Sequence, residues 1–153
     1  MQFGPEAVAD TGVMVFVDPP GGGTTGVWQP GTHTGPGRYN EAGALSWTEL
    51  LTPEPRAAVG FFQQLFGHEV TEYPQDDGGT YSTLMVNGAE VAGIVAAEAP
   101  ARWQIYFGVT DVANAVRKAV AAGAEVLIAP EPDDDDTPGA TATLKDPQGG
   151  VFS

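Results

Sequence analysis

The 153-residue sequence contains no cysteine, two histidines and only six lysine and arginine residues. Without cysteine, the chain has no disulfide, no thiolate nucleophile and no cysteine-ligated metal. A formal net charge of −14 gives no attraction for phosphate backbones or anionic lipid, which excludes nucleic acid and membrane surfaces as expected partners. No apolar run approaches the ~20 residues of a membrane span, and the first residues lack the basic and apolar regions of a signal peptide. We therefore expect a cytoplasmic protein.

The residues that are abundant predict a globular domain with many turns. Hydrophobic residues make up 42% of the chain, and glycine (21) and proline (13) are both frequent. The acidic run at residues 133–136 lacks the spacing of a calcium loop, so we interpret it as a solvated loop. His33 and His68 stand apart from other ligand types and are expected to be surface histidines.

Two segments have the pattern of amphipathic helices. The first is predicted to begin at Thr52-Pro53-Glu54, with the Thr52 hydroxyl as N-cap and Pro53 in the first turn, and to end at Gly67. The second is predicted to open at Asp111 as N-cap and to end at Gly123. Both carry apolar residues at helical spacing, which indicates one face turned toward a core.

Each predicted helix has one predicted strand before it and three after it. The strands are expected at residues 45–51, 69–73, 80–86 and 90–96 around the first helix, and at 103–109, 125–128, 140–145 and 151–152 around the second. Asn87-Gly88 is a strong signal for a tight hairpin turn. This order predicts two tandem βαβββ modules, at residues 44–98 and 102–153, within one domain at 44–153.

The N-terminal stretch contains a second repeat. Residues 10–22 and 136–150 share a strand-like pattern that leads into an Asp-Pro-x-Gly-Gly turn, at Asp18 and Asp146, about two module lengths apart. Residues 1–30 are therefore predicted to be the C-terminal remnant of a preceding module, and residues 31–43 a linker. Because its strands are apolar, we expect the N-terminal hairpin to pack on the body or to swap into a partner chain, which favours a homodimer or pairing through this hairpin.

Residues 47–54 with the helix that ends at Gly67, residues 103–111, and the turn at residues 146–149 resemble the vicinal-oxygen-chelate superfamily. This superfamily includes glyoxalase I, extradiol dioxygenases and fosfomycin- and bleomycin-resistance proteins, and the layout is similar to tandem-domain glyoxalase-like proteins of actinobacteria. The resemblance implies an α+β fold in which paired βαβββ modules form a cupped eight-stranded mixed sheet, with the helices outside and a small-molecule site inside.

The resemblance also implies a position for metal ligands on the first and last strand of each module. These positions fall on Trp47, on Gln104, on Ser153 and within residues 91–95, which contain no carboxylate. Indole offers no lone pair, and one amide oxygen does not make a site for a cation that needs three or more ligands. We therefore expect no metal and no other cofactor.

Candidate polar groups remain for the expected site. Trp47 and Glu49 share one face of the first strand by two-residue alternation, and a carboxylate among aromatic rings would have a raised pKa and could act as a general base. Glu49 and Tyr106 are the candidate catalytic residues, with the alternative that Trp47 and Tyr106 are core aromatics and Glu49 lies at the rim. The candidate binding residues are Trp47, Tyr81, Thr83, Trp103, Gln104 and Phe152.

These residues leave several functions open, and whether the chain is an enzyme is undecided. The first hypothesis is a metal-independent glyoxalase-like protein that sequesters an aromatic or polyketide-like molecule in the sheet cavity, as resistance proteins do. The second is a metal-free isomerase, lyase or ring-opening hydrolase with Glu49 as general base. The third is a non-catalytic half that pairs with another module. If the positions of the metal ligands are assigned wrongly, a metal-dependent lyase or dioxygenase is a further alternative.

Overall fold

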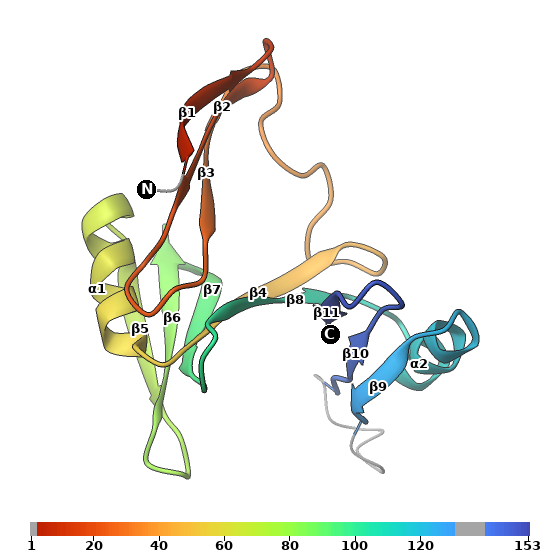
Figure 1. Ribbon diagram of the computed structural model, residues 1–153. Coiled ribbons are helices and arrows are strands. Elements are labelled where there is room, and N and C mark those ends of the chain that lie inside the picture. The colour runs from red at the N-terminus through yellow and green to blue at the C-terminus, as the bar shows by residue number, and fades with distance from the viewer. Residues whose placement is uncertain (1–2, 131–139) are drawn as a thin grey trace. The chain divides into compact units, whose positions relative to one another are not determined.

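The strands and helices follow the order that the sequence predicts. The computed structural model describes residues 3–130 and 140–153 (Figure 1), so the acidic run at 133–136 lies outside the described residues. The first module comprises β4 (Leu45–Thr52), α1 (Pro55–Phe66), β5 (Glu69–Pro74), β6 (Thr80–Val86) and β7 (Ala89–Ala96). The second comprises β8 (Arg102–Phe107), α2 (Val112–Ala121), β9 (Glu125–Ile128), β10 (Thr143–Lys145) and β11 (Val151–Phe152). The α+β class and the two βαβββ modules are confirmed.

The ends of the two helices agree with the local signals in the sequence at three of four places, and at the end of α2 the C-cap is Ala122, directly before the predicted Gly123 with its left-handed φ of 97°. Asp111 caps α2 as predicted, since its carboxylate accepts a hydrogen bond from the Asn114 amide at 2.7 Å. Gly67 ends α1 with a left-handed φ of 72°. The predicted start of α1 is wrong: the helix begins at Pro55, and Glu54 is the N-cap residue without a side-chain hydrogen bond. The Thr52 hydroxyl instead accepts from the Glu54 amide at 3.2 Å, in the turn before the helix.

The two modules share one internal strand order. In the sheet with the order β5-β6-β7-β4-β8, β4 pairs in parallel with β7. In the second module β9, β10 and β11 form an antiparallel sheet, and Ser153, which follows β11, exchanges hydrogen bonds with the backbone of Ile105 and Phe107 at 2.8 Å each. In a parallel pair, one residue bonds through its N–H and its C=O to two residues of the neighbouring strand, one on each side of the residue opposite it. The last strand of each module therefore lies parallel to its first.

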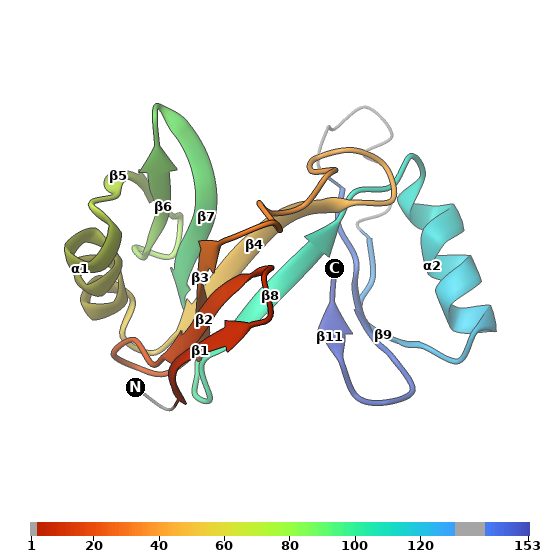
Figure 2. The same cartoon turned by 90° about the horizontal axis from the view of Figure 1, so that it is seen from above.

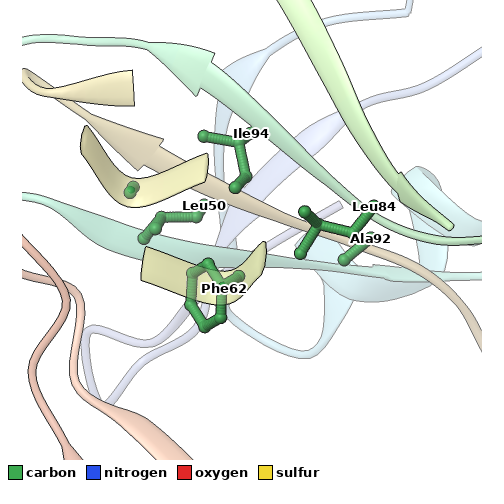
Figure 3. Close-up of a cluster of buried hydrophobic side chains, with 6 residues drawn as sticks. Leu50, Phe62, Leu84, Ala92 and Ile94 are labelled. Atoms are coloured by element: carbon green, nitrogen blue, oxygen red, sulfur yellow. The ribbon is translucent and has the colours of Figure 1, made fainter. Parts of the chain in front are cut away.

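The first module has a compact apolar core between α1 and one face of its sheet (Figure 3). Its buried residues are Leu50, Ala58, Phe62, Leu84, Ala92 and Ile94. Fully burying a Leu, Ile or Phe side chain stabilises a fold by about 1.5–3 kcal/mol, so this cluster holds α1 to the sheet. Because strand residues alternate between faces, the neighbours of these residues on β4, β6 and β7 lie on the opposite face.

The N-terminal residues form a third sheet of β1 (Phe3–Val8), β2 (Gly12–Val17) and β3 (Thr25–Pro30), which lie side by side (Figure 2). The turn between β2 and β3 packs on residues just before and at the start of β8: Gly22 forms a parallel bridge with Ala101, and Trp103 Nε1 donates to Thr25 Oγ1 at 3.1 Å. Of the two predicted outcomes for the hairpin, the structure therefore contains the packing on the body.

The chain divides into two compact units, Met1–Gly37 with Thr48–Trp103, and Arg38–Trp47 with Gln104–Ser153. The predicted domain boundaries at residues 30, 43 and 98 stay a prediction. Within the described ranges, neither helix is long and apolar enough to cross a membrane.

Candidate functional site

The sheet face opposite the α1 core carries a row of polar residues. Glu49 on β4 pairs with Gly93 on β7, and Gly93 pairs with Thr83 on β6. Leu50, Leu84 and Ile94, which alternate with these residues, all lie in the core. Thr83 is only 2% exposed and Glu49 is half-buried. The structure thus brings the predicted residues Glu49 and Thr83 onto one face of the sheet, with β7 between their two strands.

Tyr81 and Glu49 are joined across the strand between them. The Tyr81 hydroxyl, from β6, donates a hydrogen bond of 2.7 Å to Glu49 Oε1, on β4. Gly93 of β7 lies beneath this contact: a Cβ at this position would collide with the Tyr81 hydroxyl and come within 3.0 Å of Glu49 Cγ. The missing side chain at Gly93 therefore makes room for the tyrosine to reach the carboxylate.

A second carboxylate lies on the same face, and the sequence reasoning missed it. Glu90 Oε1 accepts hydrogen bonds from the Tyr73 hydroxyl at 2.7 Å and from Thr83 Oγ1 at 2.9 Å. The hydrogen bond to Glu90 raises the pKa of Tyr73, with smaller contributions from desolvation and from the Glu90 charge. The rings of Tyr73 and Tyr81 are 6.5 Å apart. The Asn87-Gly88 turn could have predicted the position of Glu90, because a two-residue turn places Glu90 opposite Met85, on the same face as Thr83.

A β-bulge in the β6–β7 pair determines which residues reach this face. Met85 pairs with Glu90, but the next pair is Leu84 with Ala92, so Val91 has no partner in the ladder. Without the bulge, Thr83 would pair with Ala92, and Gly93 would lie on the core face. The bulge therefore places Glu90 and Gly93 on one face although their spacing in the sequence is odd.

In the second unit, two of the positions predicted for metal ligands bind each other. Gln104, which is 3% exposed, donates through Nε2 to Ser153 Oγ at 3.0 Å, and the Ser153 and Thr143 hydroxyls are 2.9 Å apart. The ring of Phe152 packs edge-on against Phe107 at 6.0 Å. Trp47 and Tyr106 are half-buried. The Gln104–Ser153 contact is a polar network of the second module's interior.

Trp103 occupies a different environment from the other predicted residues of the first unit. Its ring packs edge-on against Phe62 at 6.1 Å, and its indole nitrogen donates to Thr25. It thus adjoins the α1 core, away from the Glu49–Tyr81 contact on the opposite face.

The histidines differ from one another. His33 is exposed, as expected. The prediction of a solvated His68 is wrong: the residue is half-buried beside the Phe66 ring at 5.3 Å, and no partner for its buried Nδ1 exists among the described residues. Burial lowers the pKa of His68.

The residues at the implied metal positions do not fit a divalent cation. Trp47 offers no lone pair, the Gln104 amide and Ser153 hydroxyl are hydrogen-bonded to each other, and residues 91–95 of β7 contain no carboxylate. Over residues 3–130 and 140–153 there is no group of three or more Asp, Glu or His side chains arranged to hold a metal. A hard or borderline cation requires three or more oxygen or nitrogen ligands, and these positions do not supply them.

Residues 47–153 match the family of glyoxalase-like domains. The chain is 37% identical over 149 residues to CFP32 of Mycobacterium tuberculosis, named provisionally as a glyoxylase, covering 95% of this chain and 56% of that protein. It is 33% identical over 150 residues to the anthracycline biosynthesis protein DauV of a Streptomyces species, covering 92% of this chain and 51% of that protein. Glyoxalase I from Zea mays aligns with 99% of this chain and 57% of its own, at 19% identity and a TM-score of 0.39. The chain spans about half the length of these curated relatives.

Proposed function

The chain belongs to the family of glyoxalase-like domains in the vicinal-oxygen-chelate superfamily, and from that premise we propose that it binds a small aromatic molecule without a metal. The observation that carries the proposal is the hydrogen bond from Tyr81 to Glu49 across Gly93. This bond holds the Glu49 carboxylate on the sheet face that α1 does not cover, next to Gly93, which has no side chain.

The chemistry of this face favours a flat ligand with hydrogen-bond donors. Tyr73 and Tyr81 offer two neighbouring rings, which bind apolar, planar groups well. Glu49 and Glu90 are each oriented by a tyrosine hydroxyl, and an oriented carboxylate accepts from the hydroxyl or amino group of a ligand. A hydroxylated aromatic, such as a polyketide product, satisfies both requirements.

The relatives support an aromatic ligand. DauV is named for anthracycline biosynthesis, and anthracyclines are fused-ring, hydroxylated aromatic compounds. The proposed role is sequestration of such a molecule. A cytoplasmic location, expected from the sequence, is part of the same proposal.

Calorimetric titration with daunorubicin and with 1,8-dihydroxyanthraquinone tests the proposal. We expect saturable 1:1 binding, weakened about tenfold by Tyr81→Phe and more by Glu49→Ala, because each substitution leaves a polar partner unsatisfied. Glu72→Ala is the matched control for Glu49→Ala, since Glu72 pairs with buried Ser82 on the other face of the sheet. No heat with either compound, or equal losses in the control, would contradict the proposal.

A metal-free enzyme is the second candidate, favoured by the contact between Glu49 and a proton-bearing hydroxyl. In this function Glu49 is the general base of an isomerase, lyase or ring-opening hydrolase. Glu49→Gln separates the candidates, because binding survives the substitution in a carrier while turnover of a bound compound, followed by its absorbance spectrum, is lost in an enzyme.

A further inference from the structure

One corner of the sheet face that carries Glu49 combines two aromatic rings with an oriented carboxylate. Glu90 Oε1 accepts from the Tyr73 hydroxyl at 2.7 Å and from Thr83 Oγ1 at 2.9 Å. The rings of Tyr73 and Tyr81, which pair across β5 and β6, have centroids 6.5 Å apart and are tilted by 42°. Tyr73 is 43% exposed, so its ring is accessible to a ligand. We call Tyr73, Tyr81, Thr83 and Glu90 the Glu90 corner.

The negative charge of the Glu90 corner has no positive counterpart nearby in the sheet. Tyrosine and threonine hydroxyls are neutral donors, so they orient the Glu90 carboxylate without compensating its charge. No Lys, Arg or His occurs in β4, β5, β6 or β7, and within residues 3–130 and 140–153 Glu90 forms no ion pair. The chain as a whole has a formal net charge of −14. The electrostatic field therefore favours a cation over a neutral or negative group.

A further carboxylate strengthens the negative potential beside the Glu90 corner. Glu69 on β5 pairs with Met85 on β6, and Met85 pairs with Glu90 on β7. Residues paired across strands share one face of a sheet, so Glu69 and Glu90 lie on either side of Met85 on this face. A positively charged group bound there is attracted by both carboxylates, whereas an anion is repelled by both.

The groups of the Glu90 corner suit an organic cation better than a metal ion. A divalent cation needs three or more oxygen or nitrogen ligands, and the described residues contain no group of three or more Asp, Glu or His side chains arranged to hold one. An ammonium group needs a single oriented carboxylate, and it is also attracted to the face of a tyrosine ring within about 6 Å of the ring centroid. Since the two ring centroids are 6.5 Å apart, one ammonium group can lie within that distance of both.

We propose that the Glu90 corner is a subsite for the protonated amine of an aromatic ligand, and that the protein selects cationic over neutral members of this ligand class. The inference rests on the proposed function, because the flat part of the same ligand binds beside Glu49 and Tyr81. Glu90 and the Tyr73 ring determine the selectivity. The proposed function itself requires only an aromatic ligand, so the two statements can fail separately.

Three forms of one compound serve as matched probes. Daunorubicin carries a primary amine, its N-acetyl derivative is neutral, and its N,N-dimethyl derivative keeps the charge while adding bulk. Calorimetric titration at low ionic strength is expected to show about tenfold tighter binding of daunorubicin than of the N-acetyl derivative, from a cation–π contact and an exposed ion pair. The dimethyl derivative is expected to bind like daunorubicin. Added salt should weaken the binding of both cations and leave that of the N-acetyl derivative unchanged, because salt screens exposed charges.

Glu90→Gln tests the residue that carries the selectivity, because it keeps the size of the side chain and removes its charge. We expect the preference for daunorubicin over the N-acetyl derivative to fall to about threefold or less, while the affinity for the N-acetyl derivative stays the same. Glu72→Gln is the matched control. It removes one charge from the same sheet, but Glu72 pairs with Ser82, which is buried on the other face, so the full preference should remain.

Three results would overturn the inference and leave the proposed function intact. The first is equal affinity for daunorubicin and its N-acetyl derivative, and the second is binding of the dimethyl derivative as weak as that of the N-acetyl derivative. The third is an equal loss of preference in Glu90→Gln and Glu72→Gln. Binding of neutral 1,8-dihydroxyanthraquinone reports on the proposed function alone. Absence of binding by this compound and by all three forms of daunorubicin would refute both statements.

Discussion

The hydroxyl of Tyr81 lies 2.7 Å from Glu49 Oε1, although a whole strand separates the two residues in the sheet. The contact passes over Gly93, the residue that pairs with Glu49 on one side and with Thr83 on the other. Three strands thereby contribute to one polar contact.

Gly93→Ala is expected to break this contact. The new methyl group collides with the Tyr81 hydroxyl, so the side chain must move, and overpacking of this kind costs about 1–3 kcal/mol of unfolding free energy. Urea denaturation measures the loss, and ligand titration should show about tenfold weaker binding. Gly60→Ala is the control: nothing lies within 4 Å of its added Cβ, and in the middle of α1 it is expected to stabilise by about 0.5–1 kcal/mol. If Gly93→Ala were as stable as Gly60→Ala, position 93 would tolerate a side chain, and the expected collision with Tyr81 would be refuted.

Glu90→Gln is expected to lower the pKa of Tyr73. The hydrogen bond to the Glu90 carboxylate and its negative charge both favour the protonated phenol, and the substitution removes both effects. Absorbance at 295 nm between pH 9 and 12 follows the phenolates, and Tyr73→Phe identifies the transition of Tyr73. An unchanged titration curve in Glu90→Gln would mean that the Tyr73–Glu90 contact is absent in solution.

His68 is expected to make the protein less stable as the pH falls through the ordinary range of histidine. Burial lowers the pKa of His68 in the folded state, below the value of 6.5 expected in the unfolded chain. Above pH 6.5 the residue is neutral in both states; below it, the unfolded state takes up a proton first, so the free energy of unfolding decreases. The urea midpoint at pH 7.5 and at pH 5.5 measures this change. His68→Gln should show a smaller decrease than the unsubstituted protein, and an equal decrease would refute the assignment to His68.

Divalent metals are expected to bind weakly. Calorimetry of untagged protein with Ni²⁺, Mn²⁺, Fe²⁺ and Zn²⁺ should show no affinity tighter than roughly micromolar, about −8 kcal/mol. The reason is the set of groups at the implied positions: an indole, a strand segment at residues 91–95 without a carboxylate, and an amide bonded to a hydroxyl. Stoichiometric binding of any one metal would return a metal-dependent lyase or dioxygenase as the leading function.

Much of the fold followed from local patterns in the sequence. The cap at Asp111, the stop at Gly67 and the Asn87-Gly88 turn each act within a few residues, so the sequence alone predicts them. The start of α1 was misplaced because Thr52-Pro53 and Glu54-Pro55 offer two similar signals, and packing decides between them: Thr52 is fully buried in the structure.

The candidate site was predicted only in part. Glu49, Tyr81 and Thr83 were expected at the site and lie together, since two-residue alternation fixes the face of each residue within its strand. Tyr73 and Glu90 were missed, and Trp103 lies against the core. These outcomes depend on which strands are neighbours, and a strand's own sequence does not contain that information.

The sequence by itself determined the order of elements, the two modules and the residue types at the implied metal positions, because periodicity, turn chemistry and side-chain identity are local properties. The tertiary structure alone decided that Val91 bulges, that Gly93 therefore faces Glu49, and that a tyrosine two strands away reaches that carboxylate. A bulge arises where the pairing of two strands must be reconciled with the packing of the core beneath them, and both are relations between distant parts of the chain.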